Sequence, residues 1–407
     1  MRDSAPLDAA LAEHDADGYL IDADATEADQ YYLAGFGAPD PFLTCYTPEG
    51  IHLLVSELEY GRATSESSAD TVARNADYDH REHVAEHGAL EGRNRTIAAF
   101  LADHGVEHVL VPDRFPTATA DGLREQGIEV TADLEETVAT IRARKTDEEV
   151  EHLKTAQRAN EVAMDRAAEL IGGAEIRTGD DAASAGNGDT ADGQDGTLYH
   201  DGEPLTSEFV KTEIEIALLR EGCALDETIV AGGADGADPH DRGSGPLPAH
   251  EPIVVDIFPR DKETKFHADM TRTFVRGEPS EEVVHRHEVT LAAQEAAFDA
   301  IEPGATGEEV HDAVCDLYEA EGYETLRSDD TTETGFIHGT GHGLGLEVHE
   351  LPRLAPDGTE LEPGHVVTVE PGLYDPAVGG MRIEDVVVVT EDGFENYVDY
   401  PKDLVLE

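Results

Sequence analysis

The chain has 407 residues, more than a single hydrophobic core usually organises, and 39% of them are hydrophobic, so two domains with sizeable cores are expected. Its 90 acidic and 28 basic residues give a formal net charge of −62, which disfavours nucleic acid and anionic membranes as partners. No apolar run approaches the roughly 18 residues of a membrane span, and residues 1–20 are too acidic for a secretory signal, so we expect a cytoplasmic protein.

Residues 1–140 are predicted to form a small α/β domain. Three short apolar segments, 18–21, 51–55 and 106–111, are typical of strands, and helical stretches lie between them. Thr146 then precedes a long stretch with apolar residues at helical spacing, and its hydroxyl suits an N-cap. We therefore place the domain boundary just before this helix, after residue 140.

Residues 141–407 are predicted to form a second, larger domain, interrupted by a flexible surface insertion at 179–197. The insertion consists almost entirely of small and polar residues, which cannot bury enough apolar surface to order themselves. After residue 205 helical and strand-like patterns resume, and the β-branched runs at 253–255 and 366–369 are typical of buried strands. The fold class expected is mixed α/β (α+β).

Acidic and histidine side chains stand at the ends of these predicted strands or within them. A lone carboxylate directly after an apolar strand is costly unless donors or a cation compensate it. Four carboxylates and one imidazole suit a pair of Mn²⁺, Co²⁺, Fe²⁺ or Zn²⁺ ions, which carboxylates can bridge. The three cysteines lie far apart without CxxC spacing, so a thiolate zinc site is not indicated. The candidate ligands are Asp256, Asp269, His342, Glu370 and Glu384.

Each of these acids could instead cap a turn or pair with an arginine. In a chain with 90 acidic residues, most carboxylates belong to the solvated surface. The segment 83–87 also matches the inverted zinc-protease pattern HxxEH, but no third ligand is identifiable near it, and chance explains it among 19 histidines. The joint pattern of five residues, rather than any single acid, favours a metal pair.

The segments that carry these five residues resemble the motifs of the pita-bread-fold metallopeptidases, which include aminopeptidase P, prolidase and methionine aminopeptidase. The resemblance implies a C-terminal catalytic domain with a curved antiparallel sheet, in which Asp269 and Glu384 bridge two metal ions. The matching segments are 254–257, 268–274, 338–350, 368–374 and 381–385.

The resemblance also implies roles for residues around the metals. Glu370 would move a proton from the attacking water to the leaving nitrogen, in addition to binding metal. His240 and His349 would stabilise the developing oxyanion or hold the substrate. His338 would line the proline side of the site, and Arg382 would orient Glu384.

The N-terminal half is similar to the smaller domain of aminopeptidase P, prolidase and creatinase, which methionine aminopeptidases generally lack. Creatinases lack the metal ligands, so the resemblance implies an Xaa-Pro dipeptidase or Xaa-Pro aminopeptidase that hydrolyses small proline-containing peptides. It further implies a homodimer with two divalent ions, with Mn²⁺ or Co²⁺ preferred and Zn²⁺ or Fe²⁺ compatible. Two alternatives stay open: a metal-poor pseudoenzyme that binds peptides, and an aminopeptidase without proline restriction.

The acidity itself predicts a salt-adapted protein. Repulsion among the side chains that give the net charge of −62 destabilises a compact fold at low ionic strength. In molar salt the Debye length falls to about 3 Å, so that repulsion between exposed carboxylates collapses. A salt-rich cytoplasm is therefore the simplest setting for this sequence.

Overall fold

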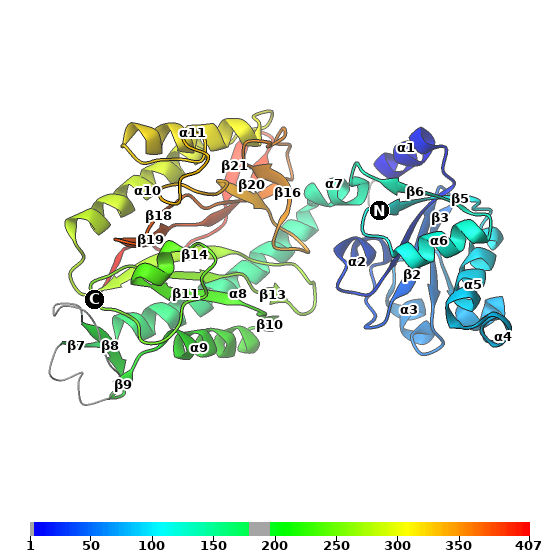
Figure 1. Ribbon diagram of the computed structural model, residues 1–407, viewed down its shortest axis with the longest axis horizontal. Helices are drawn as coiled ribbons and strands as arrows, with labels where there is room; N and C mark the ends of the chain where they lie inside the picture. The colour runs from blue at the N-terminus through cyan, green and yellow to red at the C-terminus, as the bar shows by residue number, and fades with distance from the viewer. Residues whose placement is uncertain (1–3, 179–195) are drawn as a thin grey trace. The chain divides into compact units, whose positions relative to one another are not determined.

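The computed structural model describes residues 4–178 and 196–407, and the chain divides into two compact units, Met1–Arg142 and Ala143–Glu407 (Figure 1). The insertion predicted at 179–197 lies outside the described residues apart from its last two positions. Thr197 begins strand β8 (Thr197–His200), so the insertion was predicted to extend too far. In the part of the chain that is described, none of the helices has the length and apolar character needed to cross a membrane.

The first unit is a six-stranded sheet with the order β4-β3-β2-β1-β5-β6. Strand β2 runs antiparallel to β1 and β3, whereas the β1–β5, β5–β6 and β3–β4 pairs are parallel. The three strands predicted from sequence correspond to β1, β3 and β5. The bounds are β1 (Gly18–Ala23), β2 (Phe42–Thr47), β3 (Gly50–Val55), β4 (Thr71–Arg74), β5 (His108–Pro112) and β6 (Glu129–Asp133).

Helices cover both faces of this sheet. One apolar cluster joins the strands to α5 and α6, and a second cluster on the other face joins them to α2 and α3. The helices are α1 (Ala5–His14), α2 (Ala28–Ala34), α3 (Tyr60–Glu66), α4 (His80–His87), α5 (Ala89–Asp103), α6 (Thr117–Glu125) and α7 (Thr137–Ala143).

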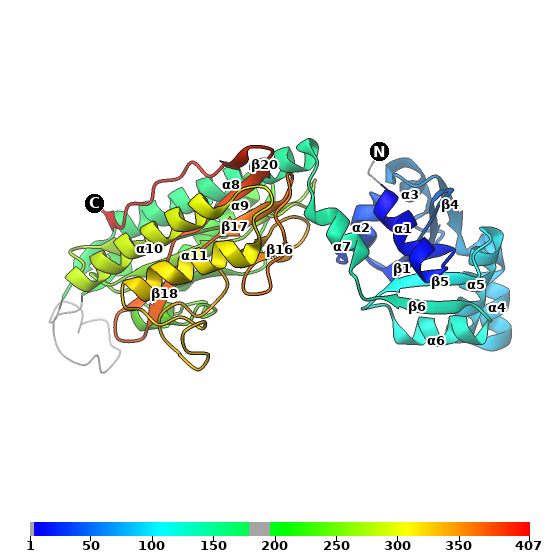
Figure 2. The ribbon, with the colours of Figure 1, turned by 90° about the horizontal axis from the view of Figure 1, so that it is seen from above.

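The second unit holds its strands between two pairs of helices (Figures 1 and 2). Helices α8 (Asp147–Gly172) and α9 (Ser207–Arg220) pack on the sheet β11-β12-β14-β22. Helices α10 (Glu281–Ala300) and α11 (Gly307–Ala320) pack on the sheet β16-β15-β17-β20-β21. Neighbouring strands in both sheets are antiparallel, except for the parallel pair β14–β22.

The strands of the second unit are short and buried where they face the two helix pairs. In the first sheet the bounds are β11 (Thr228–Gly232), β12 (Ile253–Ile257), β14 (Met270–Arg276) and β22 (Val405–Leu406). In the second they are β15 (Gly341–Gly343), β16 (Glu350–Leu354), β17 (Val366–Val369), β20 (Asp385–Thr390) and β21 (Gly393–Asn396). Three smaller sheets account for the other described strands of this unit: the hairpin β18 (Gly372–Asp375) and β19 (Gly379–Arg382), the pair β10 (Cys223–Ala224) and β13 (Arg260–Asp261), and the sheet of β7 (Glu175–Arg177), β8 and β9 (Glu203–Pro204).

Helix α8 begins with the N-cap that the sequence predicts. The Thr146 hydroxyl accepts a hydrogen bond from the Glu149 N–H at 3.3 Å, and Glu149 Oε2 accepts one from the Thr146 N–H at 2.9 Å. Two backbone donors of the first helical turn are satisfied in this capping box. Because α8 carries much of the core of the second unit, its start fixes where that core begins.

We expect Thr146→Ala to lower the free energy of unfolding of this unit by about 1 kcal/mol, because the cap is lost. The midpoint of urea unfolding, followed by circular dichroism, measures the change. The control is Thr155→Ala on the same helix, where the exposed hydroxyl donates to the Glu151 carbonyl and accepts from Arg158 Nη2 without capping the helix end. A substitution of that kind on an exposed face typically changes stability by less than about 0.5 kcal/mol. Equal effects of the two substitutions would contradict a capping role.

Candidate metal centre

The five candidate ligands come from five separate segments near the point where the two sheets of the second unit meet. The sheets join through the Glu384 N–H, which donates to the Thr271 carbonyl at 3.0 Å. Asp256 lies in β12, Asp269 directly precedes β14, His342 lies in β15, Glu370 directly follows β17 and Glu384 directly precedes β20.

The ligand atoms lie close together. Possible ligand atoms of Asp269, His342 and Glu384 all fall within 4.8 Å of one another. His342 Nε2 is 3.3 Å from Glu370 Oε1 and 3.8 Å from Asp269 Oδ2. Asp256 reaches the group through Arg382, whose Nη2 is 2.6 Å from Asp256 Oδ2. The fold therefore gathers all five predicted residues in one place.

Burial and mutual repulsion dominate the electrostatics of this cluster. Desolvation raises the pKa of Asp269 well above its ordinary value, and the charges of Glu384 and Asp256 raise it further. Desolvation and the charge of Glu370 likewise raise the pKa of Glu384. Desolvation would also raise the pKa of Glu370, but the hydrogen bond and charge of His342 outweigh it and lower this pKa to about 2. A cation placed among these carboxylates would relieve the repulsion.

Two carboxylate oxygens test whether the residues fit a metal. Asp256 Oδ1 and Glu384 Oε1 are buried and have no hydrogen-bond donor among the described residues. Their companion oxygens are bonded, Asp256 Oδ2 to Arg382 and Glu384 Oε2 to the Thr271 hydroxyl at 2.7 Å. A buried carboxylate oxygen without a donor is costly. Four carboxylates, one imidazole and two unsatisfied oxygens fit a centre for divalent cations.

Arg382 organises the side of the cluster that Asp256 occupies. Besides its ion pair with Asp256, its Nε donates to the Thr271 hydroxyl at 3.1 Å, and Nη1 donates to the Tyr374 hydroxyl at 3.1 Å. It therefore reaches Glu384 through Thr271 rather than by a direct hydrogen bond. Both members of the Arg382–Asp256 pair are buried, so the loss of either would leave an uncompensated charge.

His338 is fixed in one tautomer by its neighbours. Its Nδ1 lies 2.6 Å from the Gly339 carbonyl, which can only accept, so Nδ1 carries the proton. Nε2 then accepts from the Tyr374 hydroxyl at 3.0 Å. Desolvation lowers the pKa of His338 to about 4, which keeps the ring neutral. The ring also packs edge-on against Phe336, with centroids 5.2 Å apart.

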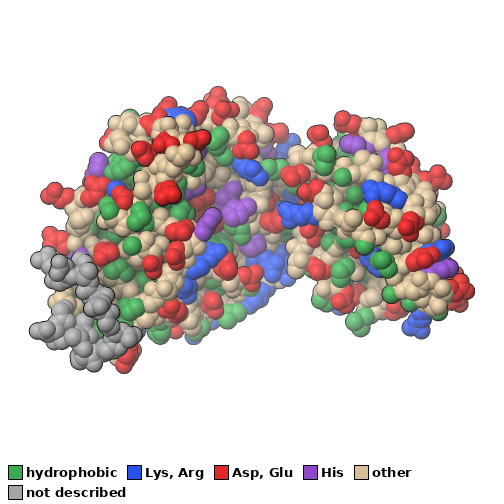
Figure 3. Space-filling model, in the orientation of Figure 1, with side chains coloured by type: hydrophobic (Ala, Val, Ile, Leu, Met, Phe, Trp, Pro, Cys, Tyr) green, Lys and Arg blue, Asp and Glu red, His purple; other side chains and the backbone are tan. Residues whose placement is uncertain are grey.

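His349 and His240 lie on the exposed side of the cluster. The His349 ring contacts the His342 ring edge-on, with centroids 4.3 Å apart. Partial desolvation lowers the pKa of His349, and His342 and His240 add to this shift, so His240 lies within electrostatic reach. Figure 3 shows a group of histidine side chains together on one face of this unit. These two histidines can therefore meet a molecule that enters from solvent.

Three hydroxyl residues, none of them among the candidate residues predicted from sequence, also belong to the cluster. Thr368 Oγ1 accepts from the His342 N–H at 3.0 Å and lies 3.4 Å from Glu370 Oε1, while Thr271 and Tyr374 contact Glu384 and His338. Thr368 stands two residues before Glu370, and Thr271 stands two residues after Asp269. The period-2 alternation of strands was the signal that could have found both threonines.

Comparison with known families identifies the chain. Residues 151–391, more than half of the chain, match metallopeptidase family M24, and residues 5–144 match the creatinase/prolidase N-terminal domain. The chain belongs to metallopeptidase family M24. The resemblance to pita-bread-fold metallopeptidases is confirmed, and so is the predicted mixed α/β fold with a smaller N-terminal part.

Individual relatives agree with membership of family M24. The chain is 38% identical to the probable dipeptidase PepE of Mycobacterium tuberculosis over 204 residues, 49% of this chain and 52% of that protein. It is 36% identical to the Xaa-Pro dipeptidase of Pyrococcus furiosus over 181 residues, 44% of this chain and 49% of that protein. The chain thus spans about half the length of the curated relatives it matches. The structure of the Xaa-Pro dipeptidase from Bacillus anthracis shares the fold, with a TM-score of 0.79, 24% identity and 98% of both chains covered.

Proposed function

We propose that this chain is a dinuclear-metal-dependent peptidase that hydrolyses the bond between a residue and a following proline. The observation that carries the proposal is the buried cluster of carboxylates around His342, in which two oxygens lack donors among the described residues. The matches to family M24 and to the creatinase/prolidase N-terminal domain support it, as do relatives named Xaa-Pro dipeptidase.

The proposed ligands are the five residues predicted from sequence, of which Asp269 and Glu384 would be shared by the two ions. Mn²⁺ or Co²⁺ is the proposed metal, and Zn²⁺ or Fe²⁺ is compatible with the same donors. When bound, such a pair acts as a Lewis acid and lowers the pKa of water from about 15.7 toward 7. The ligands are Asp256, Asp269, His342, Glu370 and Glu384.

The chain's own residues would then handle protons and charge. Glu370, ionised beside His342, would accept a proton from the attacking water on a carboxylate oxygen and pass it to the leaving proline nitrogen. Proton transfer by a positioned side chain contributes typically about 10²–10⁴-fold to rate. His349 and His240, on the exposed side, would donate to the developing oxyanion.

The proline side of the site is proposed to lie at His338. Neutral His338, held by Tyr374 and packed against Phe336, offers a flat and largely apolar wall. A proline ring lacks an N–H and crowds the preceding carbonyl, so a peptidase that pairs with an extended backbone binds it poorly. A preformed wall that accepts the ring avoids this difficulty.

We further propose that the protein works as a homodimer in a salt-rich cytoplasm. The family resemblance supports the dimer, and the net charge of −62 supports the salt-rich setting.

Hydrolysis of three peptides tests the proposed function. With Mn²⁺ or Co²⁺ in molar KCl, Ala-Pro should be cleaved and a dipeptide without proline should not. Cleavage of Ala-Pro-Ala would extend the activity to that of an Xaa-Pro aminopeptidase, whereas its resistance would define a dipeptidase. Glu370→Gln should lower kcat by about 10²–10⁴-fold, because the amide cannot accept the proton.

Two results would contradict the proposal. Equal cleavage of the dipeptide without proline would indicate an unrestricted aminopeptidase. A folded protein that binds no metal and cleaves none of the peptides would instead support a peptide-binding pseudoenzyme.

A further inference from the structure

A polar network, buried except for the half-buried Lys402, lies behind the two glutamates of the metal cluster. It consists of Gln294 on α10, Lys402 near the C-terminal end, Asp385 on β20 and Arg272 on β14, and we call it the brace. We propose that the brace positions Glu370 and Glu384, setting the separation of the two glutamates and hence the affinity and geometry of the metal centre. This inference rests on the proposed metal site.

Gln294 joins the backbone segments that carry the two glutamates. Its Nε2 donates to the Val369 carbonyl at 2.9 Å and lies 3.4 Å from the Ile383 carbonyl. Val369 immediately precedes Glu370, and Ile383 immediately precedes Glu384. Gln294 is 1% exposed, so these bonds do not compete with water. One amide group thus connects β17 to the turn between β19 and β20, at the residues that directly precede the two glutamates.

Arg272 holds the other side of Glu384. Its Nη1 donates to the Glu384 carbonyl at 2.6 Å and to the Thr271 carbonyl at 2.9 Å, and Nη2 donates to Asp385 Oδ1 at 2.8 Å. Its remaining donors bind the carbonyls of residues 400 and 401, so every N–H of the guanidinium has an acceptor. Arg272 and Asp385 are each 1% exposed, so water does not compete for this charge-assisted pair.

Lys402 connects the two halves of the brace. Its Nζ lies 2.6 Å from Gln294 Oε1 and 2.6 Å from Asp385 Oδ2, and Asn396 Nδ2 also donates to Asp385 Oδ2 at 2.9 Å. Hydrogen bonds and ion pairs therefore connect Gln294 to Lys402, Lys402 to Asp385, and Asp385 to Arg272 without a gap. The carbonyls on both sides of Glu384, and the one before Glu370, are all held by this single network.

The brace opposes a force that the cluster itself creates. Three buried carboxylates and the half-buried Glu370 repel one another, and repulsion would push the glutamate-bearing segments apart. Among the described residues, no hydrogen bond or ion pair joins Gln294 or Lys402 to a side-chain oxygen of a proposed ligand. Gln294 is uncharged, so it would act on metal binding through backbone position. Groups that orient metal ligands in this way typically contribute about 10–100-fold to metal affinity.

Titration with Co²⁺ tests the brace without any peptide. Gln294→Met removes the amide donors at nearly constant volume and is expected to weaken Co²⁺ binding by about 10–100-fold and to change the visible absorption of bound Co²⁺. Lys402→Met should act in the same direction, and it tests the same inference if Gln294→Met does not fold. Lys402→Arg, which can still bind both partners, should restore binding.

The matched control is Arg286→Leu, on the same helix as Gln294. Arg286 pairs with Glu282 and Asp375, neither of which adjoins a proposed ligand. The Arg286→Leu variant should have a lower free energy of unfolding than the wild type, while its Co²⁺ affinity and the spectrum of its bound Co²⁺ stay unchanged.

The outcomes separate the brace from the proposed function. Wild-type affinity and spectrum in folded Gln294→Met and Lys402→Met would overturn the brace, as would an equal loss in Arg286→Leu. If the wild type binds Co²⁺ and Gln294→Met binds it weakly, the brace is supported even where no Xaa-Pro peptide is cleaved. A wild type that binds no Co²⁺ overturns both proposals.

Discussion

Mn²⁺ at about 1,000 times its dissociation constant is expected to raise the thermal unfolding midpoint of the second unit by about 10 °C. Binding only to the folded state at this ratio stabilises it by about 4 kcal/mol. In a unit of this size, each kcal/mol shifts the midpoint by about 2–4 °C. Calorimetry of chelator-treated protein, with and without Mn²⁺, measures the shift.

Asp269→Asn tests the same metal site, because the substitution should affect the stability of the metal-free protein and the Mn²⁺-dependent shift of the midpoint in opposite directions. The substitution removes a charge from a group of buried carboxylates that repel one another, so the metal-free protein should be at least as stable as the wild type. The same substitution removes a proposed bridging ligand, so most of the Mn²⁺-dependent shift should disappear. Asp316→Asn, at an exposed carboxylate paired with Arg327, is the control and should keep the full shift.

A different result would give Asp269 a structural role. If Asp269→Asn lowered the midpoint of the metal-free protein by several degrees and left the Mn²⁺-dependent shift intact, the carboxylate would act as a hydrogen-bonding group of the core. The pair of measurements therefore distinguishes a ligand from a buried structural acid.

Local features of the sequence were enough to predict the start of α8, whereas the five candidate ligands were chosen from their joint pattern and from the resemblance of the segments that carry them. Thr146 and Glu149 form a capping box within four residues, so no distant contact is needed to foresee it. The position of the candidate ligands at the ends of apolar strands, where a carboxylate is costly, was one part of that pattern. Asp256, for example, lies inside a fully buried strand, where a solvated surface role is excluded.

The brace could not be predicted, because its contacts depend on how distant strands pair. Arg272 and Asp385 are 113 residues apart, and Lys402 and Gln294 are 108 residues apart. Gln294 looks like an ordinary polar position of an amphipathic helix until α10 is packed against β17 and β19. Similarly, Tyr374 stood in a motif that was matched, but only the fold shows that its hydroxyl joins His338 to Arg382.

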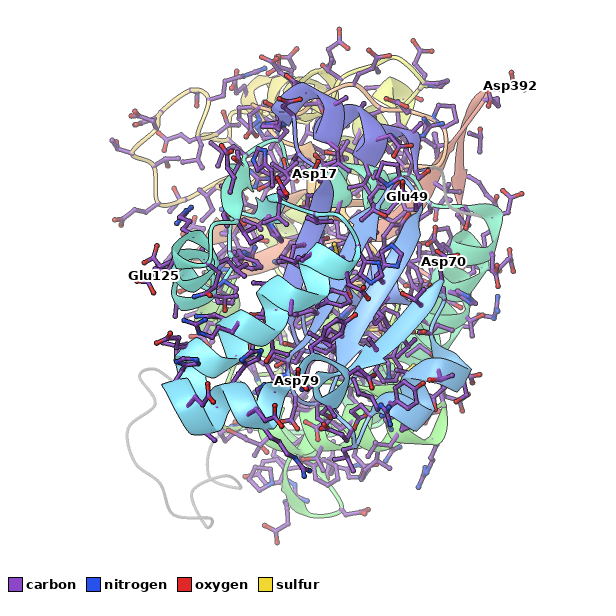
Figure 4. All side chains as sticks on the ribbon, turned by 90° about the vertical axis from the view of Figure 1, so that its right-hand side faces the viewer. Asp17, Glu49, Asp70, Asp79, Glu125 and Asp392 are labelled. Atoms are coloured by element: carbon purple, nitrogen blue, oxygen red, sulfur yellow. The ribbon has the colours of Figure 1, made fainter. Side chains whose placement is uncertain are left out.

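The surface charge creates a second large effect, which depends on solvent rather than on metal. Acidic side chains project outward over the molecule, as Figure 4 shows. In water, two like unit charges about 10 Å apart repel by about 0.4 kcal/mol before screening. Tens of such pairs give a total of several kcal/mol, which opposes the folded state more than the expanded one. The labelled examples, all exposed, are Asp17, Glu49, Asp70, Asp79, Glu125 and Asp392.

The thermal unfolding midpoint is therefore expected to rise steeply as KCl increases from about 0.1 M to about 1 M, where the Debye length falls from about 10 Å to about 3 Å. A triple substitution at exposed acids, Glu49→Gln, Glu125→Gln and Asp392→Asn, should raise the midpoint at low salt and leave it nearly unchanged at high salt. Sulfate at equal ionic strength separates screening from strengthened apolar burial, because only the second effect favours sulfate over chloride. A midpoint that is flat in KCl but rises in sulfate would show that the acidic surface carries no net penalty, and the inference of a salt-adapted protein would then fail.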